Sequence, residues 1–164
     1  MRTTCPETKG PDFDFGSSAI LVDLPNGRSA LIAGQKSGMV HALDPDRGGE
    51  ILWQKRVGQG SRLGGVQWGI AADASNVYVA VSDVQIKPVA QGTPGAQATS
   101  GISYLLDPKA GGGLFALKLE TKETVWQRPH PGCGEKASMV TCAGTPPWMG
   151  GLFGMWIRCG IMKP

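Results

Sequence analysis

Several things that the sequence lacks narrow what this chain can be. It contains no run of 18 apolar residues, so we expect no helix that crosses a membrane. Its 16 Lys and Arg residues are scattered among 13 Asp and Glu residues, and this weak positive charge predicts no nucleic-acid binding. The opening stretch MRTTCPETKG has no apolar core, so we expect no secretory signal in this sequence.

Cysteine and histidine are also scarce. The spacing of the four cysteines matches no zinc pattern and includes no C-x-x-C-H motif for attaching a haem. Disulfide bonds between them are possible, but the sequence does not assign the pairs. We interpret His41 as a strand residue and His130 as a loop residue, because neither has a partner pattern. The cysteines are Cys5, Cys133, Cys142 and Cys159.

Glycine and proline, by contrast, are abundant, with 25 and 12 among 164 residues. They are spread between short apolar runs, which is typical of an all-β protein with many turns. The length suggests one domain. The hydrophobic content of 41% and the charged content of 18% are those of a folded chain.

Alternation of apolar and polar residues predicts eight strands in two sets of four. Turn signals such as Pro25-Asn26-Gly27 separate the strands, and such short links favour antiparallel meanders. The first set covers residues 17–24, 29–34, 38–44 and 50–57, and the second covers 65–72, 76–83, 113–119 and 123–128.

The two sets form a repeat. The stretch GMVHALDPDRGGEILWQKR in the first aligns with GLFALKLETKETVWQRP in the second, and Trp53 and Trp126 are 73 residues apart. The second set carries a Pro/Gly/Ala/Gln-rich insert at 84–111, and removing its 28 residues leaves a period of 45, the length of one four-stranded propeller blade. We therefore predict about two blades of a β-propeller. The alternative is an ordinary β-sandwich with similar hairpins.

A ring needs more than two blades, since propellers use four to eight. We therefore expect the chain to be a fragment, or else half of an assembly. The predicted division is a partial propeller over 1–143, with blades at 17–57 and 65–128, and an atypical tail over 144–164. The end of that tail, TPPWMGGLFGMWIRCGIMKP, lacks strand alternation. A shifted reading frame or a partner-binding tail would explain it.

The stretch ALKLETKETVW resembles the tryptophan-docking repeat of quinoprotein alcohol dehydrogenases, roughly A-x-D-x-x-T-G-x-x-x-W. Ala116, Thr121 and Trp126 are in register with it, while Lys118 and Lys122 replace the usual acidic residue and glycine. In this family the tryptophan packs between adjacent blades, so the resemblance implies structural roles for Trp53 and Trp126. The first set matches the same pattern with Ala42, Asp44, Gly48 and Trp53, and one extra residue before the tryptophan.

The longer stretch that begins GPDFDFGSSAILVDLPNGRSALIAGQKSGMVHALD resembles the polyvinyl alcohol dehydrogenase branch of that family. The resemblance covers about residues 5–133. It implies an eight-bladed propeller, the cofactor pyrroloquinoline quinone (PQQ), a calcium ion, an alcohol substrate, a cytochrome c electron acceptor and a periplasmic or secreted location. Because most of that ring is absent from this chain, we expect the chain alone to be inactive.

The resemblance assigns chemistry to two residues. Asp14, in DFDFG, aligns with the family's base, which takes the hydroxyl proton as hydride leaves for the quinone. We expect Phe13 and Phe15 to shield it and Asp12 to support it. Lys36, in GQKSG, takes the place of a cation that polarises a quinone oxygen. A turn aspartate and an exposed hairpin lysine are the alternatives from spacing alone.

Two further residues are candidates for cofactor binding. Trp68 and Gln67, in GGVQWG, are expected at the start of the innermost strand of the second blade, where they would line the ligand channel. A tryptophan of the core is the alternative for Trp68. Asp14 is also a possible calcium ligand, because hard cations take carboxylate oxygens. A non-catalytic propeller scaffold is the rival function, and a lectin-like β protein has no supporting sugar-binding pattern.

Overall fold

The computed structural model describes residues 10–11, 13–61, 64–83, 85–99, 101–107 and 112–129. The predicted tail over 144–164, the loop residue His130, the supporting Asp12 and all four cysteines lie outside these residues. Within them, no helix is both long and apolar enough to cross a membrane.

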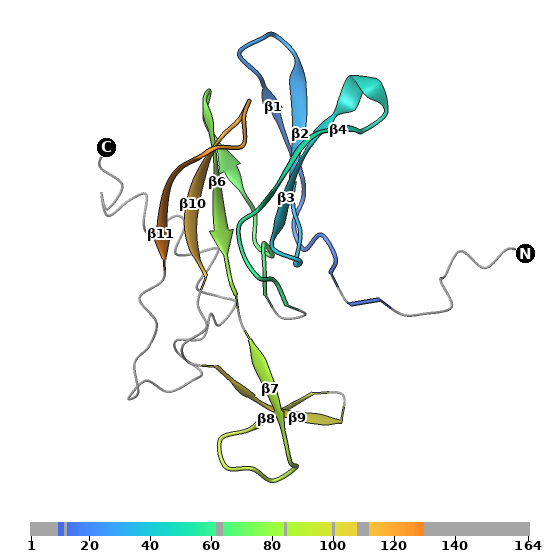
Figure 1. Ribbon diagram of the computed structural model, residues 1–164. Helices are drawn as coiled ribbons and strands as arrows, with labels where there is room; N and C mark the ends of the chain where they lie inside the picture. Colours follow the sequence, from blue (N-terminus) through green and yellow to red (C-terminus); the bar gives the residue numbers. More distant parts are fainter. Residues whose placement is uncertain are drawn as a thin grey trace, which may run out of the picture.

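The described chain is all-β, with two four-stranded antiparallel sheets and one smaller sheet (Figure 1). Within the residues that the structure describes, the single helical element is one short 3-10 turn, η1 (Pro45–Arg47). The first sheet is β1 (Ile20–Asp23), β2 (Ser29–Gly34), β3 (Met39–Asp44) and β4 (Glu50–Arg56), in that order. The second is β5 (Ala71–Ala72), β6 (Asn76–Val81), β10 (Gly113–Lys118) and β11 (Thr124–Pro129), again in chain order.

These two meanders confirm the predicted fold class, and most strands lie within a few residues of their expected bounds. The strand predicted over 65–72 is much shorter, since only Ala71–Ala72 and an isolated bridge from Gly65 to Ser82 pair with β6. The cause is a competing contact. The Val66 amide donates to the Gln35 carbonyl of the first sheet at 3.1 Å and so draws this segment out of the second sheet.

The 84–111 insert, in which we predicted no strand, contains the third sheet. Its strands are β7 (Ile86–Val89), β8 (Gln97–Thr99) and β9 (Ile102–Leu106), in the order β7-β9-β8. In Figure 1 this sheet lies below the two larger ones. The insert therefore has a fold of its own beside the second sheet.

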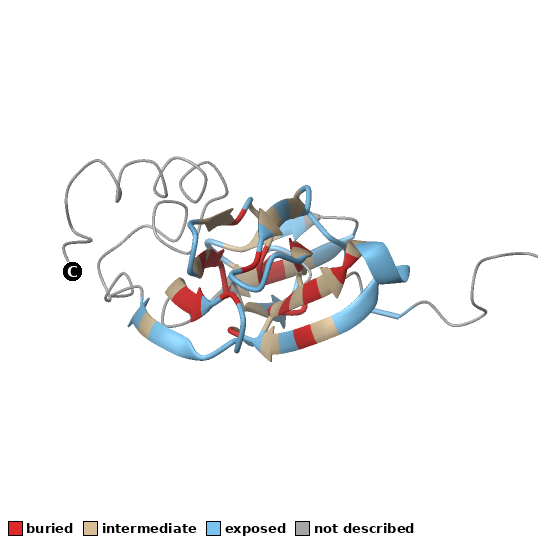
Figure 2. Cartoon of the chain, turned by 90° about the horizontal axis from the view of Figure 1, so that it is seen from above, coloured by how far each residue is buried: buried red, intermediate tan, exposed pale blue. Residues whose placement is uncertain are grey.

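The core lies between the two four-stranded sheets. Alternate residues of β2 and β3 point into it, among them the fully buried Ile32 and Val40, and they share one apolar cluster with Val77, Val79 and Leu117 of the second sheet. Figure 2, which looks down on the sheets, shows the buried residues gathered between them. Each such side chain stabilises the packed sheets by about 1.5–3 kcal/mol relative to exposure.

The strand registers show the repeat directly. Ala42 of β3 pairs with Trp53 of β4, and Ala116 of β10 pairs with Trp126 of β11. In both sheets the register then shifts at the residue after the alanine. The sequence alignment of the two sets therefore matches equivalent positions in space.

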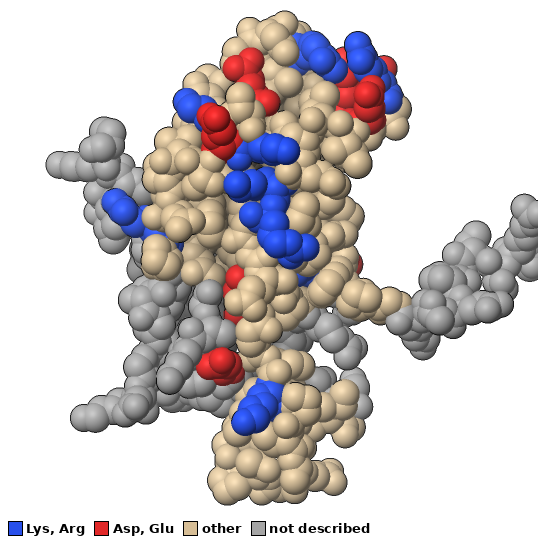
Figure 3. All heavy atoms as spheres, in the orientation of Figure 1, with Lys and Arg blue, Asp and Glu red and all other residues tan. Residues whose placement is uncertain are grey.

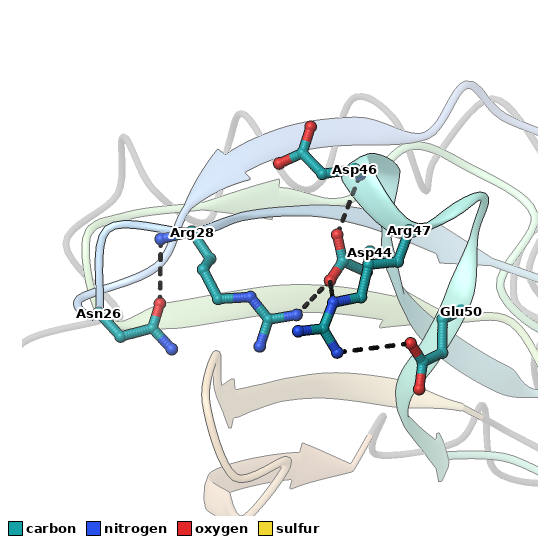
Figure 4. A network of polar contacts seen from close by, with 6 residues as sticks. All are labelled: Asn26, Arg28, Asp44, Asp46, Arg47 and Glu50. Carbon is teal, nitrogen blue, oxygen red and sulfur yellow. Dashed lines mark hydrogen bonds and ion pairs between the residues drawn. The ribbon is translucent and has the colours of Figure 1, made fainter.

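A polar network lies beside η1 at one end of the first sheet (Figure 4). In Figure 1 this end is opposite to the insert. Asp44 is 2% exposed, and its carboxylate accepts from Arg28 and from the Asp46 amide, with Arg47 at 3.7 Å. Burial alone would raise the pKa of Asp44, but the hydrogen bond from Arg28, the Asp46 amide and the two guanidinium charges together lower it. The network ties the β1–β2 hairpin to the turn after β3.

Candidate active site

Asp14 and Lys36 meet at the end of the first sheet where β1 begins. The Lys36 Nζ lies 2.8 Å from Asp14 Oδ1, and the Lys36 amide donates to the Asp14 carbonyl at 3.0 Å. Lys36 is in the tight β2–β3 turn, where the Gly38 amide donates to the Gln35 carbonyl. Two contacts, one from the backbone and one from the side chain, therefore hold the segment before β1 against this turn.

The two partners differ in burial. The side chain of Lys36 is only 12% exposed, whereas that of Asp14 is 57% exposed within the described chain. Phe15, which we expected to shield Asp14, is 51% exposed, and its ring lies 5.6 Å from the His41 ring. A carboxylate that is open on one side and held by a cation on the other can receive a ligand from the open side.

The segment after Gly64 packs on the backbone of Lys36 and on Gly16, two residues after Asp14. A Cβ placed on Gly65 would lie 1.9 Å from the Lys36 carbonyl oxygen, and one on Gly16 would lie 2.8 Å from the Gln67 carbonyl oxygen. Glycine at both places allows the backbones to touch. Gln67 is thus brought to the site. Trp68 is half-buried beside it, in the irregular segment before β5 rather than in a strand.

Asp83, just after β6, is a residue that the sequence analysis missed. Its carboxylate is buried and accepts from the Gln59 amide at 2.9 Å and the Gly60 amide at 3.0 Å. Gly60 in turn packs against the backbone of Lys36 and Ser37. Asp83 therefore positions the loop that supports the lysine. The available signal was an aspartate directly after an apolar strand.

Buried hydroxyl groups mark the same end of the molecule. The Oγ atoms of Ser17, Ser61 and Ser82 are buried, and each has no hydrogen-bond partner among the residues that the structure describes. Ser61 donates its amide to the Lys36 carbonyl, and Ser82 pairs with Gly65. Because a buried polar group without a partner is costly, this end is suited to polar groups from outside the described chain.

The donor set bears on the cofactor and metal expected from the resemblance. An ammonium group and an amide side chain are suitable donors for the oxygens of a quinone, and Lys36 and Gln67 supply them. For calcium the set is thin: within the described ranges, no group of three or more His, Cys, Asp or Glu residues could hold a metal ion. Asp14 by itself would provide one ligand of such a site.

His41 is a strand residue. It lies in β3, and its Nδ1 is 2.8 Å from Gln54 Nε2 of β4. Burial lowers the pKa of His41, because the charged imidazolium loses solvation. Its contacts with Gln54 and Phe15 account for its place in the sheet.

The two repeat tryptophans have different surroundings. Trp53 is buried, and its Nε1 donates at 2.7 Å to the carbonyl of Leu119, the residue directly after β10 of the second sheet. Trp126 is half-buried, with its ring 6.1 Å from that of Tyr78. Trp53 thus links the first sheet to the second through this hydrogen bond.

Comparison with known proteins gives two relatives. A polyvinylalcohol dehydrogenase of a Pseudomonas species is 44% identical over 127 residues, which are 77% of this chain and 17% of that protein. A polyvinylalcohol dehydrogenase of Sphingopyxis sp. (strain 113P3) is 37% identical over 125 residues, which are 76% of this chain and 16% of that protein. No family model and no solved structure matches. The predicted resemblance is confirmed, and the chain spans about one sixth of the length of these relatives.

Proposed function

We propose that this chain, which resembles polyvinylalcohol dehydrogenases, supplies part of the active site of a quinoprotein that oxidises a secondary alcohol. The observation that carries the proposal is the Asp14–Lys36 pair at one end of two adjacent sheets. The sequence resemblance assigns chemistry to the same two residues. An alcohol dehydrogenase needs a base for the hydroxyl proton and a polarised acceptor for the hydride, and these two residue types provide both functions.

In this proposal the Asp14 carboxylate accepts the hydroxyl proton of the alcohol. The Lys36 ammonium stabilises that carboxylate and would donate to an oxygen of PQQ. Gln67 and Trp68 would help to hold the cofactor, with an amide group and an aromatic face. When bound, PQQ would supply the hydride acceptor.

The remaining parts of the proposal concern the whole protein. Residues 17–57 and 65–128 would be two adjacent blades of an eight-bladed ring, closed by blades that this chain does not contain. Asp14 would give one oxygen to a calcium ion, whose other ligands come from those blades. A cytochrome c would take the electrons, in the periplasm or outside the cell. The 164-residue chain alone would be inactive, because cofactor contacts would come from all round the ring.

The test uses a chimera in which the matching segment of the Pseudomonas relative is replaced by this chain. With an artificial electron acceptor, we expect Asp14→Asn and Lys36→Ala each to lower kcat for a secondary alcohol by about 10²- to 10⁴-fold. Lys36→Arg should retain more activity than Lys36→Ala, because it keeps the positive charge.

Matched controls are Asp23→Asn, at the far end of β1, and Lys122→Ala, an exposed residue in the β10–β11 turn. Both should leave kcat within about twofold of the parent, since neither lies near the pair. If Asp14→Asn and Lys36→Ala fold and turn over as the parent does, the catalytic assignment is wrong and the scaffold alternative is favoured. Measurable quinone binding and turnover in the 164-residue chain would contradict its expected inactivity.

A further inference from the structure

The connection after β6 differs most between the two sheets. In the first sheet, β2 and β3 are joined by the short turn that carries Lys36. In the second, the equivalent strands β6 and β10 are joined by the insert with its own three-stranded sheet. Because the two connections occupy the same place in the repeat, the insert rises from the same end of the molecule as the Asp14–Lys36 pair.

Contacts at the root of the insert lead directly to the pair. The Gln85 Nε2 donates to the Gly60 carbonyl at 3.4 Å, and Asp83 holds the Gly60 amide. Gly60 packs on the backbone of Lys36 and Ser37. Gly60 therefore contacts both the start of the insert and the backbone of Lys36 in the candidate active site.

The insert does not contribute to the core between the two larger sheets. None of its described residues belongs to the apolar cluster that joins them. It is held by its own contacts: the Asp107 amide donates to the Gln85 carbonyl at 2.9 Å, and the Tyr104 hydroxyl donates to Gln97 at 3.2 Å. Because this sheet forms its own hydrogen bonds and adds nothing to the core, it is a candidate for binding a ligand or substrate.

The surface of the insert is nearly uncharged. Between Gln85 and Asp107, the charged residues are Lys87 and Asp107 itself, and the others include many hydroxyl and amide side chains. Figure 3 shows the described part of this lobe as mostly uncharged. Ile102 is 45% exposed on β9. Hydroxyl, amide and apolar groups together suit a neutral chain whose carbon backbone carries regular hydroxyl groups.

We infer that the β7–β9–β8 sheet is a specificity element that binds an uncharged polyhydroxylated polymer as it runs out of the active site. The inference rests on the proposed function and deepens it. Asp14 and Lys36 act on one hydroxyl group, whereas the insert contacts repeat units further along the chain. The insert should therefore matter for a long substrate and not for one of a few carbons.

The experiment uses the same chimera with residues 86–106 replaced by Gly-Gly, which joins Gln85 to Asp107 where they are already hydrogen-bonded. Polyvinyl alcohol and the short 2,4-pentanediol are compared with an artificial electron acceptor. We expect kcat/KM for the polymer to fall by about tenfold or more while that for pentanediol stays within about twofold. Ile102→Asp should act in the same direction, and Ile51→Asp, at a similarly exposed isoleucine on β4, should not.

Binding of labelled polyvinyl alcohol, measured without turnover, separates this inference from the proposed function. Weaker binding in the deletion and in Ile102→Asp supports the inference even if the chimera oxidises neither alcohol, an outcome that would contradict only the proposed function. Unchanged polymer binding, or an equal loss for both alcohols, overturns the inference. The inference is also overturned if the deletion lowers only the turnover with a protein electron acceptor, because the insert would then bind that partner.

Discussion

The two four-stranded sheets have the same strand order and the same register shift after an alanine, yet they use equivalent positions differently. The turn that carries the candidate lysine in the first sheet is replaced in the second by a folded insert. The two sheets thus share their strand pairing, whereas the connections between equivalent strands at one end differ in length and structure. In our proposals, the short turn of the first sheet carries a catalytic residue, and the insert of the second sheet determines specificity.

The two repeat tryptophans also differ between the sheets, in their burial. Trp53 is 7% exposed and is hydrogen-bonded to the second sheet, whereas Trp126 has no further sheet beside it within the described chain. The position in the repeat is the same, so the difference in burial comes from the neighbour. The burial of each tryptophan therefore depends on whether a further sheet lies beside its own.

The largest expected effect is the loss of Trp53. In the 164-residue chain, Trp53→Ala should lower the free energy of unfolding by about 3–5 kcal/mol, because it empties a core site and leaves the Leu119 carbonyl without its donor. Trp126→Ala should cost clearly less, since that ring is half-buried. Urea denaturation followed by circular dichroism measures both.

Trp53→Phe sharpens this comparison, because it keeps the apolar ring and removes only the N–H donor. It should cost about 1–3 kcal/mol. Equal losses for Trp53→Ala and Trp126→Ala would mean that the two sheets do not depend on the contact between them.

A smaller effect is expected at two glycines with similar backbone angles. Gly65 (φ 78°) and Gly27 (φ 79°) both lie in the left-handed region, but only at Gly65 would a Cβ collide with another chain segment, the Lys36 carbonyl. Gly27→Ala should cost about 1–2 kcal/mol for backbone strain, and Gly65→Ala about 1–3 kcal/mol more for the clash. Thermal unfolding measures the loss of stability in each variant, and the difference between the two losses is the cost of the clash.

In the chimera, Gly65→Ala should also reduce turnover, because it pushes the backbone of Lys36 away from Asp14. Gly27→Ala, in the β1–β2 hairpin, serves as the control for backbone strain. Full activity in Gly65→Ala would show that the close packing on Lys36 is not needed for the site.

Much of the fold could be predicted from the sequence, because alternation and turn residues are local signals. They were sufficient for seven of the eight strands, and the Ala–Trp pairing followed from aligning the two sets. The strand at 65–72 was overestimated, because the Val66 amide bonds to Gln35, a contact that no local pattern reveals. The strands of the insert were missed, because Pro, Gly, Ala and Gln make up half of residues 84–111 and obscure the alternation of apolar and polar residues.

The site was predictable only in part. Asp14 and Lys36 came from a resemblance, and their spacing along the chain says nothing about a 2.8 Å contact. Asp83 was missed, because its partners are backbone amides of a loop more than 20 residues earlier. An aspartate that binds amides of a distant loop looks, in sequence, like any aspartate at a strand end.

The smallest expected effect concerns His41 in the first sheet, whose equivalent in the second is Phe115, since each precedes the alanine opposite tryptophan. Burial lowers the pKa of His41 below its ordinary value of 6.5. The stability contributed by the neutral imidazole is therefore present above pH 6.5 and is lost as the pH falls through the lower folded pKa. The melting temperature of the 164-residue chain should drop slightly between pH 7.5 and pH 5.

His41→Phe copies the second sheet and should reduce that drop, because phenylalanine does not titrate. The Asp73 carboxylate, whose pKa is held at about 2 chiefly by the Tyr78 hydroxyl and the Ser75 amide, stays ionised across this range and does not contribute to the change. An equal drop in the parent and in His41→Phe would assign the acid sensitivity to other groups. It would also mean that the two sheets respond to pH alike, despite the histidine in one and the phenylalanine in the other.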